Sequence, residues 1–255
     1  MTDVEIPESH PRYQSLRTRH RIEEGVEKGI TSKQGLIAEG RGEAFDYLLG
    51  ERTIPSADRA ERAAAALLLR ARHPVISVNG NVAALGPEAV ADLAARVDAD
   101  IEVNLFNRTD ERVRAIADHL RAHGASNVKG LAADARVPGI DHERSRVDAD
   151  GIADADVVLV PLEDGDRAEA LAAMGKAEIV VDLNPLSRSA RNATIPIVDN
   201  IVRAIPNVAA HAVDLADASP AELDAIVDAF DAEAALTEAE AAIRDGVGER
   251  DEDDR

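Results

Sequence analysis

The sequence predicts an α/β protein with a mostly parallel sheet and helices on both faces. After Pro74, short runs rich in Val and Ile alternate with segments of helical periodicity. These runs are apolar throughout, which is typical of strands that are buried on both faces. Before Pro74 only helical patterns occur. We therefore expect a Rossmann-like core that follows an N-terminal helical segment and precedes a C-terminal helix.

We expect a single domain over residues 1–246, because no Gly/Ser linker and no fixed-period repeat divides the chain. The helical segment would span residues 1–73, the Rossmann-like core 74–215 and the C-terminal helix 219–245. Residues 247–255 are rich in Asp and Glu, so we expect them to form a disordered acidic tail.

The N-terminal segment divides into three expected helices. Apolar residues recur near helical spacing over residues 13–26, and residues 45–49 indicate a short helix after a glycine pair. Ser56 is the expected N-cap of the third helix, whose Ala/Leu stretch ends before Pro74.

The core alternates strands with helices. The expected strands are 75–78, 101–105, 127–130, 157–160, 178–181 and 195–198, and the expected helices are 87–97, 109–123 and 166–175. Residues 132–150 show no clear periodicity, and a loop of this length often covers a site. Ser219-Pro220-Ala221-Glu222 carries capping signals for a last long helix that runs to about Arg244.

Composition excludes several function classes. The chain of 255 residues has 29 Lys+Arg against 49 Asp+Glu, a formal net charge of −20, which argues against nucleic-acid binding and against an anionic membrane surface. Cys is absent, so disulfides, thiolate metal sites and a Cys nucleophile are excluded. We find neither an apolar run long enough for a transmembrane helix nor a signal-peptide core, so we expect a cytoplasmic protein.

The charged residues are also unusual in kind. Only four Lys occur, Ala is abundant and aromatic residues make up 2% of the chain. At molar salt the Debye length is about 3 Å, so the repulsion among the acidic groups would be largely screened. We therefore interpret the acidity as an adaptation to high salt, and not as information about the charge of a ligand.

Polar side chains follow five of the expected strands. They are Asn79 and Asn81 after the first, Asn104 after the second, Glu163, Asp164 and Asp166 after residues 157–160, Asp182 and Asn184 after the next, and Asp199 and Asn200 after the last. A lone Asn in such a position is usually a turn or cap residue. Because ligands of open α/β sheets bind beyond the carboxyl ends of the strands, we interpret the set as a binding site.

Several standard motifs are absent. The sequence has no G-x-x-x-x-G-K-[ST] and no G-x-G-x-x-G after a strand, hence neither a P-loop nor the usual dinucleotide fingerprint. It also lacks G-x-S-x-G and H-E-x-x-H. The seven His show no metal-ligand spacing, and His119 and His123 are expected at the surface. We therefore assign no metal ligand from the protein.

Three groups of charged residues allow two interpretations each. Glu163, Asp164 and Asp166 could hold Mg²⁺ or an ammonium group, or they could simply be acids at the start of a helix. Arg188 and Arg191, with Ser187 and Ser189, could bind phosphate or be surface residues. Arg41, between two glycines, could bind phosphate beside a closely approaching backbone or lie in a tight connection.

Six segments together resemble one known family, the archaeal phosphopantothenate synthetases or 4-phosphopantoate–β-alanine ligases. They are Ser9-His10-Pro11-Arg12-Tyr13, Gly40-Arg41-Gly42-Glu43-Ala44-Phe45-Asp46-Tyr47, Ser77-Val78-Asn79-Gly80-Asn81-Val82-Ala83-Ala84-Leu85, Glu102-Val103-Asn104-Leu105-Phe106, Pro161-Leu162-Glu163-Asp164-Gly165-Asp166-Arg167 and Asp182-Leu183-Asn184-Pro185-Leu186-Ser187-Arg188. The resemblance covers roughly residues 5–210, in order, and several of its motifs are long and unusual. The acidic composition suggests a haloarchaeal member.

The resemblance implies an ATP-dependent amide ligase of coenzyme A biosynthesis. Such an enzyme joins (R)-4-phosphopantoate to β-alanine and releases AMP and diphosphate by way of an acyl-adenylate, with Mg²⁺, as a homodimer with a Rossmann-like core. The positions that match the family's ATP contacts are Arg19, Arg41, Asp182, Leu183, Asn184, Arg188, Ser189, Asn200 and Ile201. Arg17 lies close to Arg19, and the match places Arg19 at the family position.

The chemistry of such a reaction suggests roles for the remaining polar residues. β-Alanine arrives as an ammonium and must lose a proton before it attacks, so Glu163, Asp164 or Asp166 is a candidate general base. Asn79, Asn81 and Asn104 can bind the hydroxyls or the phosphate of pantoate without adding negative charge.

Two other function classes compete with the ligase. A nucleotide-sensing regulatory protein would suit the same Arg and Asn residues but would not turn over ATP. An NAD(P)-dependent oxidoreductase is disfavoured by the missing glycine fingerprint. For a homodimer, residues 67–69 offer an apolar surface, unless all three leucines pack within the subunit.

Overall fold

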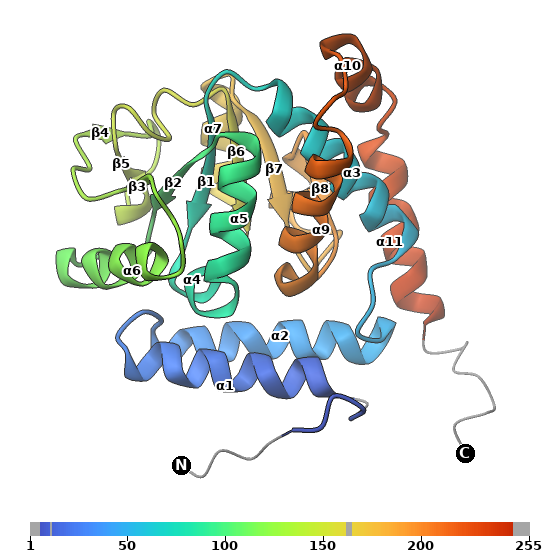
Figure 1. Cartoon of the computed structure of the whole chain (residues 1–255), viewed down its shortest axis with the longest axis horizontal. Helices are drawn as coiled ribbons and strands as arrows, with labels where there is room; N and C mark the ends of the chain where they lie inside the picture. Colours follow the sequence, from blue (N-terminus) through green and yellow to red (C-terminus); the bar gives the residue numbers. More distant parts are fainter. Residues whose placement is uncertain (1–5, 11, 162–164, 247–255) are drawn as a thin grey trace.

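Six parallel strands form one sheet at the centre of the molecule (Figure 1). The computed structural model describes residues 6–10, 12–161 and 165–246. The strands are β1 (Pro74–Val78), β2 (Asp100–Val103), β3 (Val128–Lys129), β6 (Val157–Pro161), β7 (Ala177–Val181) and β8 (Ile195–Ile197), and their order in the sheet is β3-β2-β1-β6-β7-β8. Strands β2 and β3 lie on one side of β1, and β6, β7 and β8 lie on the other. The strand order therefore reverses between β1 and β6, and doubly wound sheets bind ligands at such a reversal. The expected α/β class and parallel sheet are confirmed.

The sheet is buried on both faces. Ile76 pairs with Ile101 on β2 and with Leu159 on β6, and these side chains belong to the larger of the buried clusters. Val75 and Val158, which alternate with them, belong to a second buried cluster on the opposite face. Burial on both sides explains why the strands read as continuous apolar runs.

Helices cover one face of the sheet. They are α3 (Pro55–Arg70), α4 (Gly80–Leu85), α5 (Pro87–Val97), α6 (Asp110–Ala122) and α9 (Ile201–Asp214). Helix α9 packs between α3 and α5. The apolar residues 67–69 of α3 lie within this core or against it, with Leu67 and Leu68 buried, so they do not form a dimer surface.

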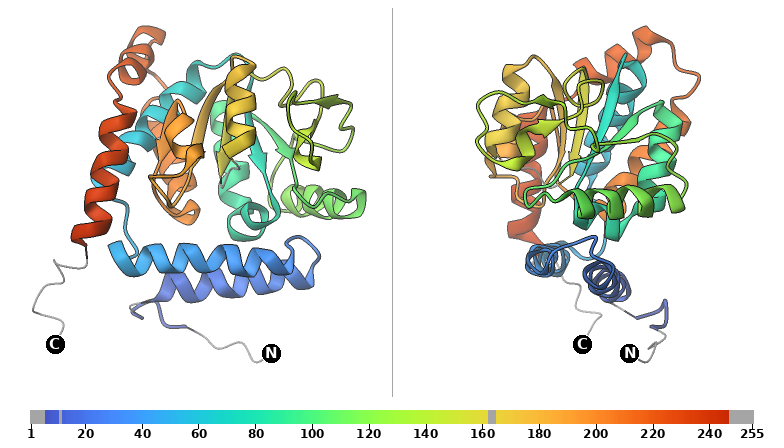
Figure 2. Two further views of the ribbon diagram at one scale, coloured as in Figure 1. Left: turned by 180° about the vertical axis from the view of Figure 1, so that it is seen from behind. Right: turned by 90° about the vertical axis from the view of Figure 1, so that its left-hand side faces the viewer.

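The opposite face is covered by α7 (Gly165–Ala173), α8 (Arg188–Asn192) and the segment between β3 and β6 (Figure 2). This segment contains an antiparallel pair, β4 (Ala135–Arg136) and β5 (Arg146–Val147), and a 3₁₀ turn, η1 (Glu143–Ser145). Val137 and Val147 pack beneath the sheet. The stretch expected to be a loop over a site is therefore in large part a cover for this sheet face.

Two antiparallel helices, α1 (Tyr13–Glu27) and α2 (Lys33–Leu49), lie across the carboxyl ends of the strands (Figures 1 and 2). Asn81, after β1, donates from Nδ2 to the carbonyl of Gly35 (3.0 Å). Asn200, after β8, donates from Nδ2 to Asp46 Oδ2 (3.2 Å). Helix α2 is thus tied to both halves of the sheet edge where the polar residues gather.

The structure corrects the expected start of α2. We expected a short helix over residues 45–49, after Gly42, and left open a tight connection at Gly40-Arg41-Gly42, but α2 runs unbroken through these residues. A Cβ at Gly42 would lie 3.1 Å from Asn200 Nδ2 and 3.1 Å from Glu39 Oε1. The glycine therefore allows α2 to approach Asn200 closely, and this tertiary contact outweighs its poor helix propensity.

Other expected helix ends are partly confirmed. Thr109 caps α6, as expected, by accepting the N–H of Arg112. Ser56, however, lies inside α3, whose N-cap is Ile54, because Pro55 takes the first helical position.

The expected single C-terminal helix is two helices. The capping box of Ser219 and Glu222 begins α10 (Pro220–Asp228) as expected. The helix then stops, and Asp231 caps α11 (Ala232–Asp245) by accepting the N–H of Ala234. Helix α11 packs against α2, α3, α8 and β8. The expected acidic tail, 247–255, lies outside the described residues. Among the helices of the described part of the chain, none is long and apolar enough to cross a membrane.

Candidate nucleotide site

An apolar cavity of about 450 Å³ opens at the sheet edge, between α2, the loop after β7 and α11. Its lining residues are Arg41, Ala44, Phe45, Leu48, Asp182, Leu183, Asn184, Pro185, Leu186, Glu240, Ile243 and Arg244. The structure therefore brings together four of the residues predicted to contact ATP: Arg41, Asp182, Leu183 and Asn184. A mostly apolar wall with a few polar groups at its rim suits a planar, largely apolar ring with polar edges.

The loop after β7 is fixed by its own side chains. Asp182 Oδ1 accepts the N–H of Asn184 (3.0 Å), and Asn184 Oδ1 accepts the N–H of Leu186 (3.0 Å). The hydroxyl of Ser187 donates to Asp182 Oδ2 (2.6 Å). These turns hold Leu183 and Asn184 at the cavity without the help of a ligand.

Arg188 and Ser189 follow this loop at the start of α8. Arg188 lies 2.6 Å from Asp166 Oδ1 and 3.5 Å from Glu169 Oε1, across the gap to α7. Ser189 is buried, and neither residue lines the cavity. Of the three acids predicted to follow β6, Glu163 and Asp164 lie outside the described residues, and Asp166 is the partner of Arg188.

The structure places Arg19 away from the cavity. Its Nε donates to Glu43 Oε2 (2.7 Å), and Arg12 and the hydroxyl of Tyr47 also contact this carboxylate. The hydrogen bond from Arg19 is the main cause that lowers the pKa of Glu43 to about 2. Glu43 lies on the flank of α2 that faces α1, whereas Arg41 lies on the flank that faces α11.

Asn200 and Ile201 begin α9 and are both buried. Asn200 Oδ1 accepts the N–H of Val202, as an N-cap does, and its amide contacts α2 through Asp46. Arg203, one turn further, lies 2.6 Å from Asp46 Oδ1 and 2.6 Å from Asp199 Oδ1. These contacts fix the junction of α2 and α9 behind the cavity. Neither Asn200 nor Ile201 lines the cavity.

The three predicted substrate-binding amides lie at the other half of the sheet edge. Asn79 caps α4 and donates to the carbonyl of Pro161 (3.2 Å), so it joins the ends of β1 and β6. Asn81 is buried between Thr31 and Gly35. Asn104 is buried and donates to the carbonyls of Arg144 (3.2 Å) and Arg146 (3.0 Å). Of these amides only that of Asn79 is part-exposed.

Sequence reasoning missed the contribution of α11. Glu240, Ile243 and Arg244 form one wall of the cavity, yet they lie in a helix about two hundred residues after α2. No local motif marks this contact. Phe45 and Leu48 had a signal in the apolar spacing of α2, which predicted a helix but not a cavity.

Glu39 was also missed. It lies on the buried side of α2, only 8% exposed, and its Oε1 has no hydrogen-bond partner among the described residues. Burial, together with the nearby carboxylate of Asp46, raises the pKa of Glu39 to about 7. A carboxyl group that titrates near neutrality suits proton transfer.

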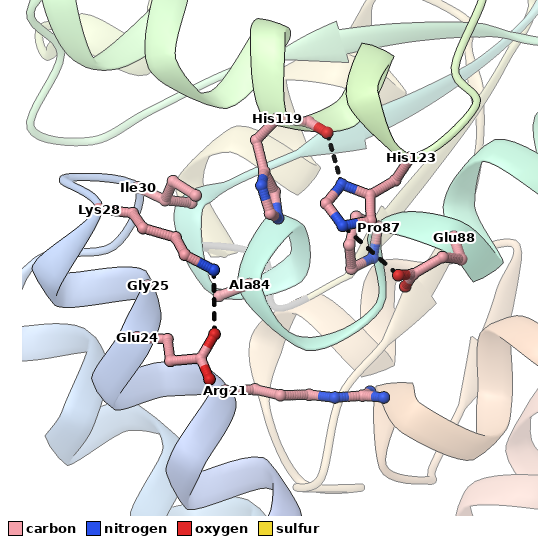
Figure 3. A pocket seen from close by; sticks show the side chains of 10 residues that line it. All are labelled: Arg21, Glu24, Gly25, Lys28, Ile30, Ala84, Pro87, Glu88, His119 and His123. Atoms are coloured by element: carbon pink, nitrogen blue, oxygen red, sulfur yellow. Dashed lines mark hydrogen bonds and ion pairs between the residues drawn. The ribbon is translucent and has the colours of Figure 1, made fainter. Parts of the chain in front are cut away.

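A second, smaller cavity of about 140 Å³ lies between α1, α5 and α6 (Figure 3). His119 and His123 line it, with Lys28 and Glu88 across from them. The two His are part-buried and not fully at the surface as expected, and His123 Nδ1 lies 2.7 Å from the carbonyl of His119.

Comparison with known proteins identifies the family. A model of the phosphopantothenate/pantothenate synthetase family matches residues 56–246. The chain belongs to this family. A 4-phosphopantoate–β-alanine ligase of Thermococcus kodakarensis is 58% identical over 243 residues, which cover 95% of this chain and 93% of the relative. A ligase of the same name from Methanosarcina mazei is 54% identical over 245 residues, which cover 96% of both chains.

For this synthetase family member, the extent of the match is informative about the cavity. The residues that the family model matches include both the loop after β7 and α11. Helices α1 and α2 precede them, but the Thermococcus and Methanosarcina ligases align over nearly the whole chain. All three walls of the cavity therefore lie within the region shared with relatives.

Proposed function

We propose that the chain is an ATP-dependent ligase that condenses (R)-4-phosphopantoate with β-alanine to give 4′-phosphopantothenate, AMP and diphosphate, a step of coenzyme A biosynthesis in the cytoplasm. The observation that carries the proposal is the cavity where Arg41 meets Asp182, Leu183 and Asn184, in a chain more than half identical to ligases of this name. The geometry suits the adenine of ATP against Phe45, with its polar edge toward the rim.

The phosphates of ATP would lie on the cationic side of this site. Arg41 and Arg188 are both exposed, and each could bind a phosphate oxygen bidentately. Arg19 would join them only after it exchanges Glu43 for a phosphate. The starts of α8 and α9 would be held in position by the buried residues Ser189, Asn200 and Ile201. Bringing two anionic reactants together requires this positive charge.

Mg²⁺ would enter with the nucleotide. Two acids line the cavity. Both oxygens of Asp182 accept hydrogen bonds from its own loop, and Glu240 is paired with Arg244. Asp166 already faces Arg188. We therefore assign the ion chiefly to phosphate oxygens, with Asp166 and Asp182 as outer partners. When bound, Mg²⁺ would stabilise the charge that develops on the diphosphate leaving group.

The second half-reaction needs a proton acceptor. The carboxylate of phosphopantoate becomes reactive as an acyl-adenylate, which must be shielded from water. The ammonium of β-alanine would be held and deprotonated by Glu163, Asp164 or Asp166, and Glu39 is a further candidate because of its burial at the same sheet edge. Asn79, Asn81 and Asn104 would orient the pantoate hydroxyls and phosphate.

We also propose a homodimer that forms through α2. Three large apolar side chains of this helix are exposed outside the cavity: Leu36, Ile37 and Tyr47. An exposed apolar patch of this kind is typical of a protein interface. Ile37 is 79% exposed, so Ile37→Asp should give a monomer in light scattering, whereas Val213→Asp on α9 should not.

A product assay tests the ligase. ATP, 4-phosphopantoate and β-alanine would be supplied with Mg²⁺ in molar KCl, and AMP, ADP and 4′-phosphopantothenate resolved. Equal amounts of AMP and 4′-phosphopantothenate are expected. Release of ADP in place of AMP would indicate that the reaction proceeds through an acyl phosphate and not through an acyl-adenylate. Nucleotide binding by folded protein without any product would favour the alternative, a nucleotide-sensing protein.

A further inference from the structure

Three side chains suited to binding a metal ion meet between α3 and α9. They are Asp58 and Glu61, one turn apart on α3, and His211 near the end of α9. One ligand atom from each lies within 4.8 Å of the other two. This is the one group of three or more such residues found in the described part of the chain. It shares no residue with the nucleotide cavity.

Glu61 gives an independent indication of a ligand. It is fully buried, with 0% of its surface exposed. Its Oε2 accepts a hydrogen bond from Asn207 Nδ2 (3.0 Å), but Oε1 has no partner among the described residues. A buried carboxylate oxygen without a partner is costly, so it calls for a proton or a cation.

The imidazole of His211 belongs to the same group of side chains. One ring nitrogen, Nε2, lies 3.0 Å from Asp58 Oδ1, and the other, Nδ1, is buried with no partner in the described structure. Asp58 is 61% exposed at its side chain, so the group opens to solvent on this side. An ion could therefore enter, and water could complete its coordination.

The surrounding charge also favours a cation. The carboxylates of Asp199 and Asp58 lie near Glu61, as does the guanidinium of Arg203. Arg203 is itself engaged by Asp46 and Asp199.

We propose that Asp58, Glu61 and His211 bind one divalent transition-metal ion of the zinc type. One imidazole and two carboxylates suit Zn²⁺, whereas Mg²⁺ and Ca²⁺ prefer oxygen ligands alone. Bonds of about 2.0–2.2 Å require the ligand atoms to close in from their present spacing, which the exposed Asp58 can do by a rotamer change. Asn207 would orient Glu61 from behind, as outer hydrogen bonds do at metal sites.

The expected consequence is structural. The ion would join α3 to α9, whose first residues, Asn200 and Arg203, fix the junction with α2. It would stabilise the folded state, because the ligands come from two helices that separate on unfolding. The inference does not depend on the proposed ligase activity.

The test uses the untagged full chain, stripped of metal with a chelator, in molar KCl. Equilibrium dialysis against Zn²⁺ should give one bound ion per chain. At free Zn²⁺ a hundred times the dissociation constant, Tm should rise by about 5–10 °C. Mg²⁺ at the same concentration should leave Tm unchanged.

Variants separate this site from other histidines. Asp58→Asn, Glu61→Gln and His211→Gln should each weaken Zn²⁺ binding at least about tenfold, because loss of even an outer hydrogen-bond partner of a ligand typically costs about 10–100-fold in affinity. Asp58→Asn changes an exposed residue, so it tests the site even if a buried substitution impairs folding. His123→Gln is the matched control, because it removes half of the His pair on α6. Wild-type protein that binds no Zn²⁺, or binding that His123→Gln abolishes and Asp58→Asn leaves intact, would overturn the proposal.

Discussion

Arg188 Nη2 lies 2.6 Å from Asp166 Oδ1, and this ion pair joins the start of α7 to the start of α8. The two side chains are 63% and 68% exposed, so the pair contributes little to stability. Its position is more informative. It sets a candidate phosphate-binding cation against a candidate general base, next to the reversal point of the sheet.

Asp166→Asn should therefore affect catalysis more than folding. If Asp166 accepts the proton of β-alanine, the amide should slow amidation about 10²–10⁴-fold and adenylate formation much less. Single-turnover assays of the two half-reactions measure this difference. Glu169→Gln is the matched control, because Glu169 is the other acid near Arg188 and lies 3.5 Å from it. Equal loss in both half-reactions would remove Asp166 from the role of base.

Ile243→Ala tests the contribution of α11 to nucleotide binding. The substitution removes apolar surface from the cavity wall, so KM for ATP should rise about 5–30-fold, corresponding to about 1–2 kcal/mol. The KM values for phosphopantoate and β-alanine should stay within about twofold. Val213→Ala, at an exposed apolar site on α9, should change none of the three. An unchanged KM for ATP in Ile243→Ala would place the adenine elsewhere.

The sheet could be predicted from sequence because its signal is local. Each strand is a short apolar run, and burial on both faces leaves no other placement for it. Helix caps such as Thr109 and Ser219 were recognisable for the same reason, since a cap acts within three residues. The polar residues after the strands lie at the edge of the sheet where the cavity opens.

The rest depends on contacts between distant segments. Gly42 reads as a helix breaker, and only its approach to Asn200 explains an unbroken α2. The wall that α11 gives to the cavity likewise joins the two ends of the chain. Asp58, Glu61 and His211 meet across about 150 residues, so no metal-ligand spacing exists in the sequence. Such contacts leave no local pattern to recognise.

Glu39 should make stability fall as pH rises. Its pKa is about 7 in the folded chain, where burial disfavours the charge, against an ordinary value of 4.5. Between these values the folded state holds a proton that the unfolded state has lost, so unfolding free energy decreases by about 3 kcal/mol from pH 4.5 to pH 7. Glu39→Gln removes this group, so its stability relative to wild type should increase over the same range.

Urea unfolding of both proteins at several pH values provides the measurement. Glu102, whose pKa burial also raises to about 7, is present in both and cancels in the difference. Parallel curves for wild type and Glu39→Gln would mean that Glu39 titrates normally, and would remove it as a candidate proton acceptor.

Arg203→Met should be the most destabilising of these substitutions. Arg203 is the cation between Asp46 and Asp199, whose side chains are 2% and 1% exposed. Without it two buried carboxylates face each other, and loss of one partner of a buried ion pair costs about 3–5 kcal/mol. Arg59→Met is the control, because Arg59 forms an exposed pair with Glu238 and should cost at most about 1 kcal/mol. Similar losses in the two variants would mean that water reaches Asp46 and Asp199, and that the junction of α2 and α9 does not depend on this pair.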